Sequence, residues 1–239
     1  MSFNYPMSIN QIDIGNFFQD MRRFFRALSE MQKDISEDLD TIPTNQPYQR
    51  ICDFGCGDGL STLNLTSSLG AEKAFGVDKY ESNINRAKLW GRALTKFIEL
   101  SEVNDDIDID LQDQATKVIA LHQSIEFKVG DVARNEMPSN LNIAYCNLLL
   151  VNIYKSAYEN QLSGISGVEA AIENISKSLV GGGYFLAIEQ YGQGLDFNYL
   201  FEKVGLKGNG IPFLRKPITT DSRAFFVENR IRYVYRKCL

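Results

Sequence analysis

The sequence predicts an α/β fold: a doubly wound, mostly parallel sheet with an antiparallel hairpin strand at the C-terminus and a helical segment at the N-terminus. After residue 48, short apolar runs alternate with longer runs of helical periodicity, which is typical of parallel strands joined by crossover helices. Near the C-terminus, two alternating segments surround one asparagine, as in a hairpin. The chain has 239 residues, 44% of them hydrophobic and 23% charged, which is enough for one sizeable core.

The first 45 residues are predicted to be largely helical. Six apolar side chains recur at spacings of one, three and four residues and form a broad helix face: Phe17, Phe18, Met21, Phe24, Phe25 and Leu28. The stretch from Asp40 to Tyr48 contains two prolines and is predicted to be a turn-rich linker. We therefore expect a helical cap or lid over residues 1–45 and a second domain over residues 46–239.

Five strands and three helices are expected next along the chain. Apolar runs predict strands at Arg50–Phe54, Lys73–Val77, Ser124–Val129, Asn142–Leu149 and Tyr184–Ile188. The runs between them predict helices at Leu60–Leu69, Glu81–Leu100 and Val168–Leu179. At the end, Phe225–Glu228 and Ile231–Tyr235 alternate around Asn229 and predict the antiparallel hairpin.

Composition limits the classes of function. Thirty acidic against 25 basic residues give a net charge of -5, so nucleic acid is not an expected partner. No apolar run is long enough to span a membrane. Four cysteines without metal-ligand spacing and a single histidine, His122, predict no metal site and favour a reduced, cytoplasmic setting. The seven acids between Glu99 and Asp113 do not match a calcium-binding loop and predict a solvated surface insertion.

The strongest local signal is a run of three glycines at alternate positions, Gly55, Gly57 and Gly59, between the first strand and its helix. Glycines let the backbone turn sharply beside a ligand, and the helix N-terminus beyond them supplies free N–H groups. Asp78 ends the next strand, where an acid can accept hydrogen bonds from ribose hydroxyls. The glycine spacing disfavours NAD, and Asp53 suits a ligand that carries an amino group and a sulfonium. These residues predict a nucleotide-like ligand.

Further motifs follow in order: Val77-Asp78, Val129-Gly130-Asp131-Val132, Tyr145-Cys146-Asn147-Leu148 and Leu179-Val180-Gly181-Gly182-Gly183-Tyr184. Together with the glycine run, they resemble the class I S-adenosylmethionine-dependent methyltransferases over roughly residues 48–190. The resemblance implies a Rossmann-like fold, S-adenosylmethionine as cofactor and no metal. It implies that Asp78 binds the ribose, and that Asp131 and Val132 bind the adenine. The residues expected to bind the cofactor are Asp53, Phe54, Gly55, Cys56, Gly57, Gly59, Asp78, Lys79, Asp131, Val132 and Asn147.

The favoured function is methyl transfer from S-adenosylmethionine to an O, N or C nucleophile of a small molecule by in-line displacement. Because the sulfonium is already a good electrophile, positioning and desolvation are the enzyme's main tasks. Glu189 and Tyr191, after the fifth strand, are the candidates for accepting a proton or orienting the acceptor, and Asn147 and Asn152 lie near the end of the fourth. The N-terminal segment is expected either to line an apolar pocket with Phe3, Tyr5 and the Phe17–Phe25 stripe, or to pack on the sheet.

Three alternatives stay open at this point. The chain could be a protein or RNA methyltransferase, or a cofactor-binding but inactive subunit with a methyltransferase fold, and a nicotinamide oxidoreductase is weakened by the glycine spacing. The absence of Asn-Pro-Pro-Tyr and Asp-Pro-Pro-Tyr argues against amino-methylation of adenine, cytosine or glutamine. We expect a small-molecule acceptor, no membrane partner, and a monomer or homodimer.

Overall fold

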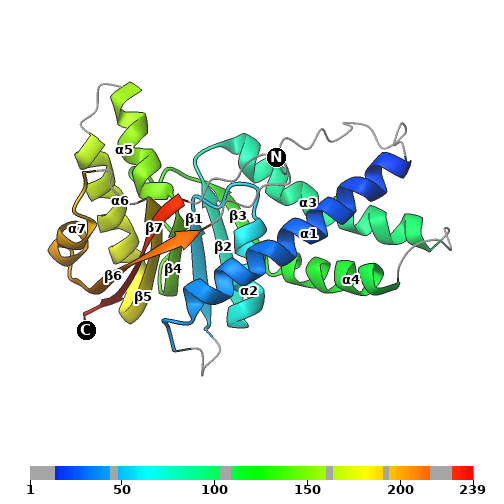
Figure 1. The fold of residues 1–239 in the computed structure, drawn as a ribbon, viewed down its shortest axis with the longest axis horizontal. Helices are drawn as coiled ribbons and strands as arrows, with labels where there is room; N and C mark the ends of the chain where they lie inside the picture. Colours follow the sequence, from blue (N-terminus) through cyan, green and yellow to red (C-terminus); the bar gives the residue numbers. More distant parts are fainter. Residues whose placement is uncertain are drawn as a thin grey trace.

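The computed structural model describes residues 14–43, 48–102, 109–159, 164–190, 194–215 and 228–238. These residues form a seven-stranded sheet with helices on both faces (Figure 1). The strands are β1 (Arg50–Phe54), β2 (Lys73–Asp78), β3 (Ile125–Val129), β4 (Leu141–Asn147), β5 (Leu179–Gln190), β6 (Leu206–Arg215) and β7 (Glu228–Lys237). Their order across the sheet is β3-β2-β1-β4-β5-β7-β6.

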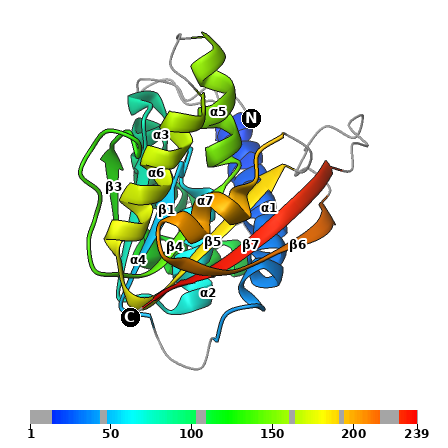
Figure 2. The ribbon, with the colours of Figure 1, turned by 90° about the vertical axis from the view of Figure 1, so that its left-hand side faces the viewer.

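Strand β1 lies where the winding of the sheet reverses direction. It pairs in parallel with β2 on one side and with β4 on the other, so Ile51 lies between Ala74 and Ile143. Strands β1 to β5 are all parallel, and β7 is inserted antiparallel between β5 and β6 (Figure 2). This arrangement confirms the predicted fold class, a doubly wound and mostly parallel sheet with an antiparallel C-terminal strand.

Helices cover the two faces of the sheet as separate layers. They are α1 (Ile14–Leu39), α2 (Leu60–Leu69), α3 (Glu81–Ser101), α4 (Ile109–Gln123), α5 (Leu149–Glu159), α6 (Gly164–Ser178) and α7 (Phe197–Lys203). The first four pack on the face that carries Ile51, and the last three on the face that carries Cys52 (Figure 1), since successive strand residues point to opposite faces. In the described part of the chain, no helix has the length and apolarity needed to cross a membrane.

Helix α1 belongs to the core of the molecule. Phe24 packs on Trp90 of α3 with ring centroids 4.2 Å apart, and both Phe24 and Phe25 are buried. Of the two expectations for the Phe17–Phe25 stripe, the structure shows packing against the sheet layer. Phe25 and Leu28 also line a cavity of about 250 Å³ with residues of α2 and α4, and the expectation that the stripe lines an apolar pocket for the acceptor stays a prediction. Phe3 and Tyr5 lie outside the described residues.

A buried ion pair attaches the end of α1 to the middle of the sheet. Arg232 on β7 places both Nε and Nη2 at 3.0 Å from Asp38 Oδ1, and Tyr145 on β4 donates its hydroxyl to Asp38 Oδ2 at 3.2 Å. The Asp38 side chain has no exposed surface, and that of Arg232 is 13% exposed. Because removing one partner of such a pair leaves a buried charge uncompensated, these contacts fix α1 in place.

The fourth strand ends earlier than predicted, and a helix follows it at once. Strand β4 ends at Asn147 and α5 begins at Leu149, because Leu148 adopts a left-handed φ of 56° that a strand cannot continue. Residues 148–151 are all apolar, and periodicity alone does not separate a strand from a buried helix in so short a run. The predicted strand Asn142–Leu149 is therefore too long, and α5 is missing from the prediction.

The C-terminal antiparallel pair also differs from the predicted hairpin. Asn229 lies within the continuous strand β7, opposite Leu214 of β6, rather than in a turn. Strand β6 contains two glycines and a proline, which weaken the sequence signal of a strand. Residues 225–227 of the predicted hairpin lie outside the described residues. The acidic segment ends α3 and begins α4, and its central residues 103–108 lie outside the described residues as well.

Candidate functional site

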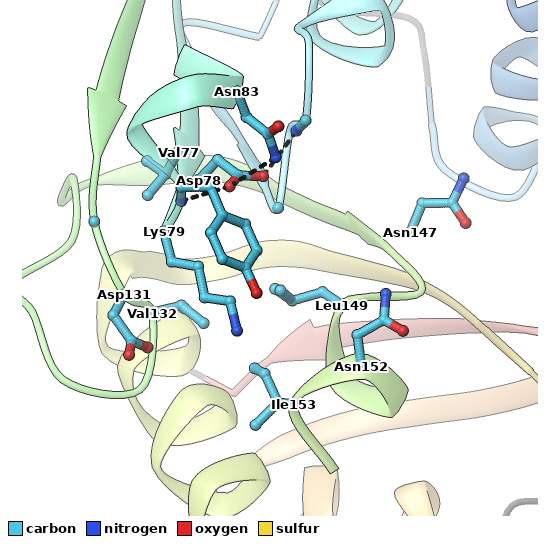
Figure 3. A pocket seen from close by; sticks show the side chains of 14 residues that line it. Val77, Asp78, Lys79, Asn83, Asp131, Val132, Asn147, Leu149, Asn152 and Ile153 are labelled. Atoms are coloured by element: carbon cyan, nitrogen blue, oxygen red, sulfur yellow. Dashed lines mark hydrogen bonds between the residues drawn. The ribbon is translucent and has the colours of Figure 1, made fainter. Parts of the chain in front are cut away.

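A cavity of about 270 Å³ opens at the carboxyl ends of four adjacent strands, β3, β2, β1 and β4 (Figure 3). Open α/β sheets bind ligands at this place, where the strand order reverses. The cavity is lined by Gly55, Gly57, Val77, Asp78, Lys79, Tyr80, Asn83, Gly130, Asp131, Val132, Asn147, Leu149, Asn152 and Ile153. The structure thus brings together most of the residues predicted to bind a cofactor: Gly55, Gly57, Asp78, Lys79, Asp131, Val132 and Asn147.

The glycine loop crosses the end of β2 in a conformation that requires glycine. The Gly55 N–H donates to the Val77 carbonyl at 2.7 Å, and Gly55, Gly57 and Gly59 have φ values of 75°, 56° and 85°, which side chains disfavour. A Cβ at Gly57 would meet nothing within 4 Å, whereas one at Gly59 would lie 2.8 Å from the Phe127 ring. Gly57 therefore leaves space beside the cavity, and Gly59 permits close packing of α2 against the sheet.

The Asp78 carboxylate is fixed at the end of β2 by three hydrogen bonds. Oδ2 accepts from the Gly57 N–H at 3.0 Å, and Oδ1 accepts from the Tyr80 N–H at 2.9 Å and the Asn83 side-chain amide at 3.1 Å (Figure 3). The residue is only 7% exposed, yet it lines the cavity. A carboxylate has about four acceptor positions, so Asp78 can also accept a ligand hydroxyl in this fixed orientation.

Asp131 and Val132 form the part of the wall that follows β3. Asp131 Oδ1 accepts a hydrogen bond from the Ala133 N–H at 3.0 Å, and Val132 is buried beside it. Figure 3 shows Asp131 on the opposite side of the cavity from Asn147. An acid beside an apolar side chain can hold a flat ring that carries an amino group, because the ring packs while the amino group donates.

The turn from β4 into α5 forms the wall opposite Asp131. It contributes two amide side chains and two apolar ones: Asn147, Asn152, Leu149 and Ile153. Asn147 Oδ1 accepts a hydrogen bond at 2.9 Å from Nη1 of Arg230, a buried residue on β7. Because an amide side chain both donates and accepts, Asn147 and Asn152 can orient a hydroxyl or an amine at this side of the cavity.

Four residues predicted to bind the cofactor lie behind the cavity wall: Asp53, Phe54, Cys56 and Gly59. Asp53 Oδ2 accepts hydrogen bonds from Ser61 Oγ at 2.5 Å and Thr62 Oγ1 at 2.8 Å, at the start of α2. Burial raises the pKa of Asp53 to about 6, although both hydroxyl donors lower it. Its carboxylate supports the helix after the glycine loop, and its contact with a ligand stays a prediction.

Glu189, one of the two predicted catalytic residues, is fully buried. Its Oε1 accepts from the Leu150 N–H at 2.9 Å and its Oε2 from the Val151 N–H at 3.0 Å. Burial raises the pKa of Glu189 to about 7. Both oxygens face the N-terminus of α5 rather than the cavity, so its role as a proton acceptor stays a prediction that this geometry does not favour. Tyr191, the other predicted catalytic residue, lies outside the described residues.

Several lining residues were not anticipated from the sequence: Tyr80, Asn83, Leu149 and Ile153. Asn83 follows the start of α3, where a short amide side chain often caps local backbone or side-chain groups. Leu149 and Ile153 are four residues apart and share a helix face, a signal that depends on recognising α5. No signal in the sequence points to Tyr80.

Comparisons with known proteins give matches in structure alone. No model of a known protein family matches the chain, and no curated protein matches it in sequence. A TehB-like SAM-dependent methyltransferase from Corynebacterium glutamicum is 19% identical with a TM-score of 0.53, and the match covers 93% of this chain and 97% of that one. Magnesium protoporphyrin IX methyltransferase from Synechocystis PCC 6803, with bound SAM, is 14% identical with a TM-score of 0.51, over 95% and 86% of the two chains.

A third similar structure has a different activity. The [4+2]-cyclase SpnF is 11% identical with a TM-score of 0.56, over 87% of this chain and 81% of that one. At such identities the likeness shows a shared fold, and the reaction has to be argued from the residues at the site.

Proposed function

We propose that this chain, which has the Rossmann-like fold of the class I S-adenosylmethionine-dependent methyltransferases, binds S-adenosylmethionine and transfers its methyl group to a small molecule. The observation that supports this most is the convergence of Gly57, Asp78, Asp131 and Asn147 on one cavity. These residues end or follow four different strands, and each belongs to one of the motifs that resemble the methyltransferases.

The residues present fit the cofactor. Asp78 would accept a hydrogen bond from a ribose hydroxyl, and Asp131 with Val132 would hold the adenine, while Gly57 admits the ligand close to the backbone. When bound, S-adenosylmethionine supplies an electrophilic methyl group on a sulfonium. Since Asp78 is already fixed by three donors, little ordering of its side chain is needed on binding.

The opposite wall would position the acceptor. Asn147 and Asn152 can hydrogen-bond to a hydroxyl or an amine. Leu149 and Ile153 are apolar and would exclude water from the space between the two asparagines. Among the described lining residues the acids are Asp78 and Asp131, which we assign to the cofactor. The described chain therefore favours an acceptor whose reaction depends on orientation more than on a carboxylate base.

Calorimetric titration tests the cofactor. We expect the protein to bind S-adenosylmethionine and S-adenosylhomocysteine but not NAD. Asp78→Ala should weaken binding by about tenfold or more, because it removes a charge-assisted hydrogen bond of roughly 1.5–3 kcal/mol to the ligand. The matched control is Asp113→Ala, which changes an exposed acid on α4 and should bind like the wild type. Absence of binding by the wild type would overturn the proposal.

Transfer from S-adenosylmethionine labelled in its methyl group tests the acceptor class. We expect label to pass to small molecules of a cell extract, and to be lost with Asp78→Ala. Label in protein or RNA instead would favour the runner-up, a macromolecular methyltransferase. Cofactor binding without transfer to any fraction would favour a cofactor-binding protein that does not methylate.

A further inference from the structure

The acceptor side of the cavity depends on a turn with an unusual backbone. Leu148 has a φ of 56°, a left-handed conformation that non-glycine residues rarely adopt. Four residues on either side of Leu148 line the cavity: Asn147 before it, and Leu149, Asn152 and Ile153 after it. Strain of this kind persists only where surrounding contacts hold it.

Glu189 supplies the contacts that the turn and the helix need. The first N–H groups of a helix have no partner within it, and at α5 the Leu150 and Val151 N–H groups donate to the two oxygens of Glu189. Next to it on β5, the Ile188 carbonyl accepts the Leu148 N–H at 2.7 Å. The end of β5 therefore accepts hydrogen bonds from three backbone N–H groups after β4, those of Leu148, Leu150 and Val151.

Arg230 interacts with both the Glu189 carboxyl group and the cavity wall. It lies on β7 opposite Gln190, and its Nη1 donates to Asn147 Oδ1 at 2.9 Å. Its positive charge favours the ionised form of Glu189 and so opposes the effect of burial. Glu189 thus holds the helix end, and Arg230 beside it holds the asparagine that faces the cavity.

We infer that Glu189 is a positioning residue: its carboxylate holds the turn 147–149 and the first turn of α5 in the conformation that forms the acceptor-side wall. This assignment differs from that of a general base, because Glu189 acts through Leu150 and Val151 and touches no reacting atom. Its effect on ligand affinity rests on the proposed function, whereas its effect on the backbone does not.

Hydrogen exchange of backbone amides, followed by NMR, tests the effect on the backbone in the ligand-free protein. Glu189→Met removes both acceptors, and Glu189→Gln, the conservative variant, keeps one. We expect the amides of Leu150 and Val151 to exchange about tenfold faster or more in the Met variant, because each loses its hydrogen bond to the Glu189 carboxyl group. The Gln variant should restore part of the protection.

The control is Glu173→Gln, which changes an exposed glutamate on α6 that pairs with Lys177 and should leave these amides unchanged. Amides of β1 report global stability and should keep their relative protection in every variant. If the amides of Leu150 and Val151 exchanged in Glu189→Met at the rate of the wild type, the inference would be overturned. Equal acceleration throughout the chain would also overturn it, since that is the mark of a general loss of stability.

Affinity for S-adenosylhomocysteine tests the effect on the cavity. We expect a loss of about tenfold for Glu189→Met, a smaller loss for Glu189→Gln and none for Glu173→Gln, because Asn147 and Leu149 of the turn line the same cavity as the residues assigned to the cofactor, and ligand binding must then also order the turn. Wild-type affinity in the Met variant would contradict the assignment. If the wild type itself does not bind the compound, the proposed function fails, and the exchange rates still decide the role of Glu189.

Discussion

Replacing Asp53 with asparagine should stabilise the protein near neutral pH. Asp53 is 2% exposed, and its ionised form depends on Ser61 and Thr62 for hydrogen bonds. Its pKa in the folded protein is raised from 3.8 to about 6, chiefly by burial. The folded state therefore holds the proton more tightly than the unfolded chain does, and ionisation of this carboxyl opposes folding.

The sign and the size follow from that difference. The contribution of Asp53 to the free energy of unfolding is largest below pH 3.8, falls as the pH rises to about 6, and is constant above. A shift of about two pKa units corresponds to about 3 kcal/mol. Asparagine has the shape of the protonated acid and does not ionise. At pH 7.5, the free energy of unfolding of Asp53→Asn should therefore exceed that of the wild type by up to about 3 kcal/mol, and near pH 4 the two free energies should be similar.

Urea unfolding at pH 4.5, 6 and 7.5, followed by the emission of Trp90, the single tryptophan of the chain, measures this difference. Other groups that titrate in the same range, including Glu189, are shared by both proteins and cancel in the comparison. Asp113→Asn, at an exposed position on α4, should show no such pH dependence. The reasoning fails if Asp53→Asn is less stable than the wild type at pH 7.5, or if their difference does not change with pH.

Two further predictions concern stability and ligand access. Asp38→Ala should lower the free energy of unfolding by about 3–5 kcal/mol, against less than about 1 kcal/mol for Asp20→Ala, which removes an exposed ion pair; equal losses in urea unfolding would refute the role given to the buried pair. Gly59→Ala should lower the free energy of unfolding by roughly 2–4 kcal/mol, because a side chain strains the positive φ and contacts the Phe127 ring. Gly57→Ala should lower it only by the backbone strain, but should weaken binding of S-adenosylhomocysteine. Melting curves measure the loss of stability and calorimetry the loss of affinity. A greater loss of stability in Gly57→Ala than in Gly59→Ala would contradict the distinction between these glycines.

Prediction from sequence was most accurate where residues with strong local preferences mark both ends of an element. Strand β1 and helix α2 have the predicted bounds, Arg50–Phe54 and Leu60–Leu69, because the glycine loop separates them and Gly70 ends the helix in a left-handed conformation. The cofactor side of the cavity was predictable for the same reason, since it is built at strand ends marked by glycine or by Asp78.

The acceptor side was not predictable, because its geometry depends on contacts between distant segments. The left-handed φ of Leu148 is opposed by its own side chain and depends on β5, forty residues further along the chain. The direction of the Glu189 side chain is likewise set by the position of α5. Strand β6 is stabilised by pairing with β7, which offsets the poor strand propensity of its glycines.

The place of β7 has a consequence for the protein while it is being synthesised. Strand β7 leaves the ribosome after the other described strands, yet it is an interior strand: β5 and β6 both pair with it, and Arg232 on it pairs with Asp38, 194 residues earlier. A nascent chain that lacks residues 228–238 has no strand for β6 to pair with and no guanidinium for the buried Asp38. The sheet and helix α1 must therefore reach their final arrangement after β7 has been synthesised, and a chain truncated before β7 exposes the edge of β5 to other chains.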